Sequence, residues 1–275
     1  MSESPDRAPS ELLDILGTTQ AEPLVGGRTN RLWRAGHQVA KLYSPNGGTP
    51  LFANSAQAEW DALTALRGKG LAPNPLSRHR LPQGDCLIYE HLPGTPGAAP
   101  PDAVARMLHR LHSLPALEGF EPATIGQGVL AEAKKMLGEV SRRLDAPFPL
   151  APTEPSKRCI IHRDPVPANI VSTGSGAILI DWQCPGLGDP LEDIAHFLSP
   201  AMQALYGGDP AQSERSAAFL AAYPEAETAE RYRRNGAAFH YRVAAYCAWK
   251  AAHGDADYAR ALPLEIALLN AWPTG

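Results

Sequence analysis

The sequence predicts an α+β fold of two lobes, a small mixed lobe rich in β-strands followed by a larger, mostly helical lobe. Short apolar segments typical of strands gather before residue 92, whereas helical periodicity dominates after residue 101. Between them, residues 92–101 contain four prolines and two glycines, a composition that disfavours helices and strands. We therefore expect an N-terminal lobe over residues 1–91, a linker over 92–101 and a C-terminal lobe over 102–275. The chain of 275 residues is long enough for both lobes.

The N-terminal lobe is expected to hold three strands and one helix. The strand candidates are the apolar runs Leu32–Arg34, Val39–Tyr43 and Cys86–Glu90. Between residues 53 and 66 the apolar spacing becomes helical, and Gly68 and Gly70 then supply stop signals.

The C-terminal lobe is expected to be helical around one compact β region. Asp102 is a candidate N-cap for a helix with apolar residues on one face, and residues 127–144 and 225–253 also have helical patterns. The β region comprises residues 159–161 and two further runs, 169–172 and 177–180, which flank a four-residue turn with two glycines. That arrangement predicts a β-hairpin.

Composition excludes several function classes. Twenty-five Lys and Arg residues against 29 Asp and Glu give a net charge of −4, which disfavours nucleic acid as a partner. No apolar run approaches the roughly 20 residues that span a bilayer, and Met1–Ser10 is polar, unlike a signal peptide. The four cysteines are widely spaced, without a Cys-x-x-Cys pair. We expect a soluble cytoplasmic protein.

The chemistry-bearing residues surround the predicted hairpin. Asp164 follows the run 159–161, Asn169 begins the first hairpin strand, and Asp181 ends the second. An antiparallel hairpin brings Asn169 and Asp181 to the same end of the two strands, and we expect Asp164 to lie nearby. Two carboxylates and an amide oxygen are hard ligands suited to Mg²⁺, and a carboxylate beside that metal can orient and deprotonate a hydroxyl.

These motifs resemble a known family. The pattern His162-x-Asp164-x-x-x-x-Asn169, followed by Ile-Asp-Trp at residues 180–182, is similar to the catalytic segment of the aminoglycoside phosphotransferase/choline kinase family, and residues 188–195 are similar to its downstream signature. The resemblance spans about residues 25–195 and implies a protein-kinase-like two-lobed fold. It also implies that Asp164 is the catalytic base, that Asn169 and Asp181 hold Mg²⁺ on ATP, and that His162 braces the loop.

The N-terminal half supports the same resemblance. Lys41 resembles the lysine that grips the nucleotide phosphates, and Glu59, on the apolar face of the predicted helix, is its expected partner. The turn Gly26-Gly27-Arg28-Thr29-Asn30 resembles the phosphate-covering turn of choline-kinase-like members. By the same resemblance the nucleotide contacts are Gly27, Thr29, Asn30, Lys41, Glu59, Glu90 and Leu92, with Tyr89, Glu90 and Leu92 joining the lobes at the adenine edge.

Several residues depart from the family pattern. Arg163 stands where small-molecule kinases commonly carry glycine, and Pro165 and Val166 replace the usual residues beside the base. Asp181 is followed by Trp-Gln instead of Phe-Gly, and no Ala-Pro-Glu segment follows, so a protein kinase is disfavoured.

The acceptor site is less defined by the sequence. Asp189 and Glu192 lie close behind Asp181 and favour a cationic acceptor, and Tyr246 and Trp249 share a helix face that suits an amine. The same acids also fit structural turn or helix-cap roles, and aromatic residues at this spacing are often core. His196 is expected to be a packed residue.

Together these observations predict an enzyme that moves the γ-phosphoryl group of ATP to a hydroxyl of a small molecule. A choline- or ethanolamine-like amino alcohol is the first choice of acceptor, with thiamine and aminoglycosides as alternatives. Two other classes stay open: a nucleotide-binding pseudokinase adaptor, and a metal-dependent hydrolase built on His162, Asp164, Asp181 and Asp189.

Overall fold

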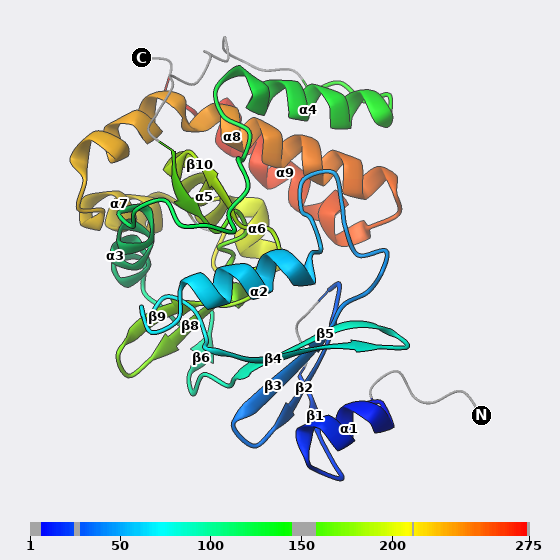
Figure 1. Cartoon of the computed structure of the whole chain (residues 1–275). Helices are drawn as coiled ribbons and strands as arrows, with labels where there is room; N and C mark the ends of the chain where they lie inside the picture. The colour runs from blue at the N-terminus through cyan, green and yellow to red at the C-terminus, as the bar shows by residue number, and fades with distance from the viewer. Residues whose placement is uncertain (1–6, 25–27, 145–157, 211, 274–275) are drawn as a thin grey trace.

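The computed structural model describes residues 7–24, 28–144, 158–210 and 212–273. Figure 1 shows a sheet at the bottom of the view and a stack of helices at the top, with helix α2 crossing between them. The first helix, α1, lies beside the sheet, and the last helix, α9, lies among the helices of the stack.

The N-terminal sheet has five antiparallel strands in the order β1-β2-β3-β5-β4. Its strands are β1 (Glu22–Pro23), β2 (Arg31–Ala35), β3 (Gln38–Leu42), β4 (Pro75–Leu81) and β5 (Gly84–Glu90), and its helices are α1 (Ser10–Leu16) and α2 (Ala56–Ala65). The three predicted strands correspond to β2, β3 and β5. The short β1 and the polar β4, whose sequence alternates Ser, Arg, His and Arg, carry no apolar run that would reveal them.

Both faces of this sheet are covered, because alternate residues of β3 and β5 point to opposite sides. Val39 and Leu87 pack in one apolar cluster with Leu63 of α2. Ala40 and Ile88, each one position further along, pack in a second cluster that also includes α1. The central strand β3 is therefore buried on both faces, and a polar residue on it, such as Lys41, needs a charged partner.

The C-terminal lobe is built around one long buried helix, α8, which packs against α4, α5 and α9. The helices of this lobe are α3 (Pro101–His112), α4 (Gln127–Glu139), α5 (Pro190–Phe197), α6 (Pro200–Leu205), α7 (Gln212–Ala222), α8 (Ala226–Ala252) and α9 (Ala256–Asn270). Two prolines at the start of α3 and α5 favour helix initiation, because their fixed φ suits the first turn.

Two helix ends differ from the sequence expectation. Asp102 is not the N-cap of α3: Pro100 takes that position, and Asp102 lies in the first turn, 2.7 Å from Arg106. Helix α4 ends at Glu139 rather than near residue 144, since Ser141 adopts a positive φ of 51° that a right-handed helix cannot continue.

The β region divides into two small sheets. The hairpin joins β8 (Ile170–Thr173) to β9 (Gly176–Leu179) through a two-residue turn, and β6 (Thr95–Pro96) pairs with the outer edge of β8. The segment β7 (Cys159–Ile161) does not join this hairpin and pairs instead with β10 (Gly186–Gly188). The two-residue strand β6 lies inside the proline-rich segment 92–101, and it can form there because an edge strand tolerates proline.

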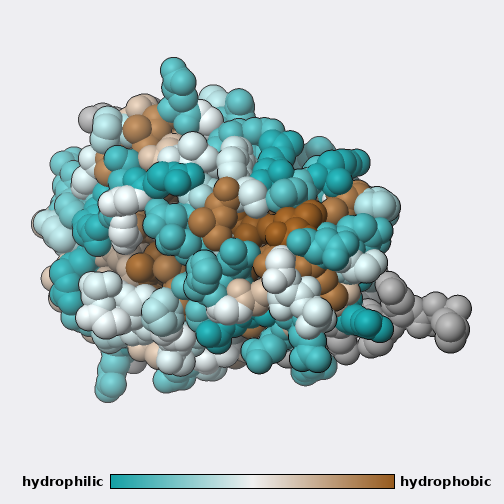
Figure 2. Space-filling model, turned by 60° about the horizontal axis from the view of Figure 1, so that its bottom comes forward, coloured by the Kyte–Doolittle hydropathy of each residue, from teal (hydrophilic) through white to brown (hydrophobic). Residues whose placement is uncertain are grey.

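The surface in Figure 2 is mostly hydrophilic and is crossed by one band of apolar atoms. None of the helices within the described residues combines the length and the apolar character that a bilayer crossing requires.

The pairing of β6 with β8 depends on a close approach at Gly94. A β-carbon at this position would overlap the backbone carbonyl of Ser172 and lie 2.7 Å from Val171 Cγ1. We predict that Gly94→Ala lowers the free energy of unfolding by about 1–3 kcal/mol, measured by urea denaturation. The control is Gly138→Ala in α4, where an added β-carbon meets no atom within 4 Å, and stability should hold or rise slightly. Equal stability of the two variants would contradict this account of Gly94.

Candidate active site

A cavity of about 360 Å³ lies between the N-terminal sheet and the β8–β9 hairpin. Its walls include Val39 and Tyr89 from the sheet and Val171 and Ile180 from the hairpin side. Eight of the residues that the sequence nominated line it, and they are Thr29, Asn30, Lys41, Glu90, Leu92, Asp164, Asn169 and Asp181. Gly27, also nominated, falls outside the described residues.

Lys41 is held at the cavity wall by two carboxylates. Its Nζ forms ion pairs with Glu59 of α2 and with Asp181, and the Tyr43 hydroxyl donates a hydrogen bond to Glu59 as well. Burial alone would lower the pKa of Lys41, but the charges of Asp181 and Glu59 raise it above the ordinary value, so the ammonium stays charged. Glu59 itself is buried behind Lys41, where it fixes the lysine without reaching the cavity.

The hairpin brings Asn169 and Asp181 to one end, as the strand pairing requires. Asn169 closes a 3₁₀ turn (Pro167–Asn169) just before β8, and its carbonyl accepts a 2.9 Å hydrogen bond from Ile180 N–H, next to Asp181. Asp181 has a positive φ of 66°, an uncommon conformation for a non-glycine residue that turns the chain beyond β9.

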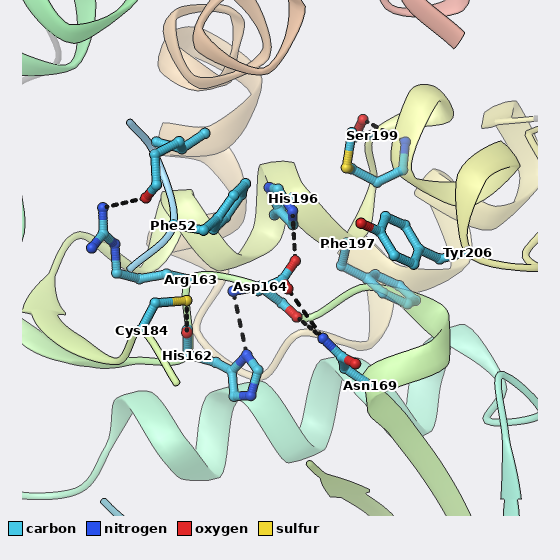
Figure 3. Close-up of polar contacts among 12 residues, drawn as sticks. Phe52, His162, Arg163, Asp164, Asn169, Cys184, His196, Phe197, Ser199 and Tyr206 are labelled. Carbon is cyan, nitrogen blue, oxygen red and sulfur yellow. Dashed lines mark hydrogen bonds and ion pairs between the residues drawn. The ribbon is translucent and has the colours of Figure 1, made fainter. Parts of the chain in front are cut away.

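Asp164 is held from two sides, as Figure 3 shows. The Nδ2 of Asn169 donates to Asp164 Oδ2 at 3.2 Å and to its backbone carbonyl at 3.0 Å. On the other side, His196 Nε2 lies 3.1 Å from Asp164 Oδ1. The carboxylate keeps about 15% of its side-chain surface exposed, on the cavity wall. It is therefore fixed in orientation yet accessible to a ligand.

The loop that carries Asp164 is anchored by a buried carboxylate on α5. Asp193 Oδ2 and Oδ1 accept hydrogen bonds from the backbone N–H groups of His162 (2.9 Å) and Arg163 (2.7 Å). A third contact comes from His112 Nε2 at 3.1 Å. Burial would raise the pKa of Asp193, but the hydrogen bond and charge of His112, with the His162 contacts, hold it below its ordinary value.

His162 braces the loop from below. Its Nε2 lies 3.0 Å from the carbonyl of Ile180, and its Nδ1 accepts a 3.3 Å hydrogen bond from Asp164 N–H. Burial lowers the pKa of His162, which keeps the imidazole neutral at pH 7. A neutral ring that donates from Nε2 and accepts at Nδ1 satisfies both contacts, and so ties the loop to the end of the hairpin.

The nominated acceptor residues do not line this cavity. Asp189 caps α5 and forms an ion pair with Arg231, and Glu192 lies between Arg163 and Arg242 at 3.0 and 2.8 Å. Tyr246 and Trp249 stack at an interplanar angle of 9°, and Tyr246 is buried against Phe52 and Tyr258. Among the described residues these four serve the packing of the C-terminal lobe.

Sequence reasoning missed two residues at the cavity's far end, Arg28 and Tyr206. The guanidinium of Arg28 lies 5.5 and 5.6 Å from the ring centroids of Tyr206 and Tyr258. It also forms a 2.8 Å ion pair with Asp257 at the start of α9. Arg28 and Asp257 are 229 positions apart in the chain, so no local sequence pattern predicts their ion pair.

His196 was expected from the sequence to be a packed residue, and it is buried, but its contact with Asp164 was not anticipated. It lies three positions after Asp193 on α5, and residues three apart on a helix face the same side. Asp193 binds the backbone of residues 162 and 163. His196, one turn further along α5, therefore reaches the side chain of Asp164.

Comparison with known proteins agrees with the resemblance in the sequence. Residues 20–238 match the phosphotransferase enzyme family. A choline/ethanolamine kinase family protein from Mesorhizobium loti has a similar structure, with 18% identity, 92% of this chain and 93% of that chain covered, and a TM-score of 0.60. A choline kinase from Streptococcus pneumoniae has 19% identity, coverages of 94% and 96%, and a TM-score of 0.58.

A third similar structure is the GDP complex of an aminoglycoside 2'-phosphotransferase, with 16% identity, coverages of 92% and 93%, and a TM-score of 0.66. A search of curated proteins finds no match. The predicted protein-kinase-like α+β fold, with a β-rich N-terminal lobe and a helical C-terminal lobe, is thereby confirmed.

The Asp193 anchor generates a pH-dependent prediction. Since its pKa in the folded protein lies below the ordinary 3.8, Asp193 stabilises the fold above about pH 4, and this contribution is lost as the pH falls through the folded-state pKa. We expect Asp193→Asn to lower the free energy of unfolding by about 2–4 kcal/mol at pH 7. The difference from the wild type should shrink as the pH falls below about 4, where the unfolded carboxyl takes up a proton first and the folded carboxyl follows only at lower pH. Urea denaturation at pH 3.0, 4.0, 5.5 and 7.0 measures it, and a pH-independent difference would contradict the assignment.

Proposed function

The chain belongs to the phosphotransferase enzyme family, and from that premise we propose that it moves the γ-phosphoryl group of ATP to a hydroxyl of a small molecule. One observation carries the proposal: a single cavity joins Lys41 of the sheet to Asp164, Asn169 and Asp181 of the hairpin region. These residues supply a phosphate-binding cation, a base and two oxygen ligands in one space, the parts that phosphoryl transfer requires.

The nucleotide is proposed to enter against the sheet. Leu32, Val39 and Leu92 provide apolar walls for a base, and Lys41, charged and fixed, faces the phosphates. The backbone N–H groups of Glu90 and His91 donate to Asn74 and His37 carbonyls at 2.9 and 2.7 Å, which leaves the Leu92 N–H for the adenine edge. Thr29 and Asn30 line the cavity and follow the two glycines that resemble the phosphate-covering turn. The amide of Asn30 is itself hydrogen-bonded to Asn54, Gln183 and the Ser44 N–H.

Asn169 and Asp181 fit a magnesium ion by their chemistry. The amide nitrogen of Asn169 is used on Asp164, so its oxygen is free to act as a ligand, and Asp181 retains one carboxylate oxygen beside the one that pairs with Lys41. When bound there, magnesium supplies the charge neutralisation that the terminal phosphates need. The ion pair with Lys41 holds Asp181 at the cavity wall before any ligand arrives.

Asp164 is proposed as the catalytic base. Its carboxylate is clamped by Asn169 and His196 but remains open to the cavity, where it can accept a hydrogen bond from an acceptor hydroxyl and then its proton. Because phosphoryl transfer is governed mostly by positioning and charge, the value of this geometry lies in holding the hydroxyl in line with the phosphorus.

Tyr206 lines the cavity beside Arg28 and offers an aromatic face, which suits an ammonium group. The Asp257 carboxylate is occupied by the Arg28 guanidinium. Two of the similar structures are a choline/ethanolamine kinase family protein and a choline kinase, and the turn at residues 26–30 resembles that of choline-kinase-like members. An amino alcohol such as choline or ethanolamine is the proposed acceptor on these grounds, with thiamine and aminoglycosides as alternatives.

Two other classes remain as outcomes of the test. A pseudokinase adaptor would bind nucleotide without turnover. A metal-dependent hydrolase built on His162, Asp164, Asp181 and Asp189 is disfavoured, because both His162 nitrogens are engaged within the loop and Asp189 is committed to Arg231 and the α5 cap.

We predict that Asp164→Ala lowers acceptor-dependent ADP release by about 10²–10⁴-fold, while binding of Mg·ATP, measured by calorimetry, stays within about twofold. Asp181→Ala should instead weaken magnesium-dependent nucleotide binding. The assay is an ADP-release screen of the purified protein against amino alcohols, thiamine, aminoglycosides, sugars and homoserine.

Asp14→Ala, which removes an exposed carboxylate on α1, is the matched control and should leave both measurements unchanged. Full turnover by the Asp164 variant would remove the base assignment. Nucleotide binding by the wild type without turnover on any acceptor would favour the adaptor instead.

A separate prediction concerns the acceptor end of the cavity. Replacing Tyr206 by leucine removes the aromatic face next to Arg28, and cation–π contacts contribute about 0.5–2 kcal/mol, so we expect the KM for choline to rise roughly 2- to 30-fold with the KM for ATP unchanged. Tyr206→Phe keeps the ring and should behave like the wild type. An unchanged KM for choline in the leucine variant would contradict a cationic site at this ring.

A further inference from the structure

The imidazole of His196 contacts the carboxylate of the proposed base from inside the C-terminal lobe. Its side chain is 4% exposed, and Nε2 lies 3.1 Å from Oδ1 of Asp164, on the side opposite to Asn169 (Figure 3). His196 does not line the cavity, so it reaches a ligand only through Asp164. The residue is therefore placed to act on the base and not on the substrate.

Helix α5 explains why His196 lies there. Its N-terminus is capped by Asp189, and its first turn presents Asp193 to the backbone of residues 162 and 163. His196 follows three positions later on the same face and reaches the carboxylate of the next loop residue, Asp164. One rigid helix thus fixes the backbone of the loop with Asp193 and its reactive side chain with His196.

The imidazole ring is itself held in place. Phe52, in the segment between β3 and α2, packs edge-on against it with ring centroids 5.3 Å apart and an interplanar angle of 70°. Phe52 in turn packs edge-on against Tyr246 at 5.0 Å, within the buried C-terminal cluster. A ring confined in this way cannot swing away from Asp164 without disturbing the packing of both neighbours.

We propose that His196 is a positioning residue for the Asp164 carboxylate, an assignment that rests on the proposed phosphotransferase function. His196 Nε2–H donates to Oδ1 while Asn169 Nδ2–H donates to Oδ2, so both oxygens are fixed by donors on opposite sides. Each carboxylate oxygen has two lone pairs, which leaves acceptor capacity for the hydroxyl of the substrate. Loss of the His196 donor frees the carboxylate to rotate away from that hydroxyl.

The test separates the hydrogen bond that His196 Nε2 donates from the packing of the imidazole ring against Phe52. His196→Phe keeps an aromatic ring against Phe52 but removes the donor, and His196→Gln places an amide N–H at about the reach of Nε2. We expect the phenylalanine variant to lower kcat roughly 10- to 100-fold with the KM for ATP within about twofold, because only the alignment of the base is lost. The glutamine variant should recover most of kcat. His79→Gln, which alters a histidine on β4 that contacts Ser77, is the control and should match the wild type.

A second readout is independent of turnover. In ¹⁵N NMR of the full chain, the His196 Nε2 resonance should shift on going from wild type to Asp164→Asn, while that of His79 stays in place. Wild-type kcat in the phenylalanine variant, a glutamine variant as slow as the phenylalanine one, or an unmoved His196 resonance would each overturn the proposal. Absence of turnover in the wild type would instead overturn the proposed function, and the NMR experiment would still decide whether His196 holds Asp164.

Discussion

The arrangement of the cavity depends on one buried carboxylate, that of Asp193. It accepts the N–H groups of His162 and Arg163 and so fixes the loop at the point where Arg163 adopts a positive φ of 72°. Asp164, the next residue, lies on the cavity wall. A carboxylate that accepts two backbone hydrogen bonds at 2.7 and 2.9 Å offsets the cost of an unfavourable backbone conformation, which is about 1–2 kcal/mol. The orientation of the Asp164 carboxylate therefore depends on Asp193, which does not line the cavity.

The residues whose surroundings are local or strand-paired could be predicted from the sequence. Short apolar runs identified β3 and β5, and the two glycines between apolar runs identified the hairpin that joins Asn169 to Asp181. Lys41 and Glu59 could be paired because each faces an apolar surface where an unpaired charge is costly. In these cases a few neighbouring residues determine both the element and the direction of the side chain.

Contacts between distant elements could not be predicted in this way. The position of Arg28 over Tyr206 and Tyr258 depends on how the lobes meet, and β7 pairs with β10 because of the path of the chain between residues 161 and 186. The acids Asp189 and Glu192 were nominated for the acceptor on proximity in sequence alone, yet helix α5 turns both toward arginines inside the lobe. A charged residue at a buried position needs an oppositely charged partner, but the sequence does not identify that partner.

Arg163 links these points, because it stands where the sequence resemblance leads one to expect glycine. A glycine would accept a φ of 72° without strain, whereas arginine bears the cost and gains an ion pair with Glu192, which Arg242 also binds. Burial would lower the pKa of Arg163, but the Glu192 charge raises it above the ordinary value, so the guanidinium stays charged. Glu192 is thereby committed to holding the loop that carries Asp164.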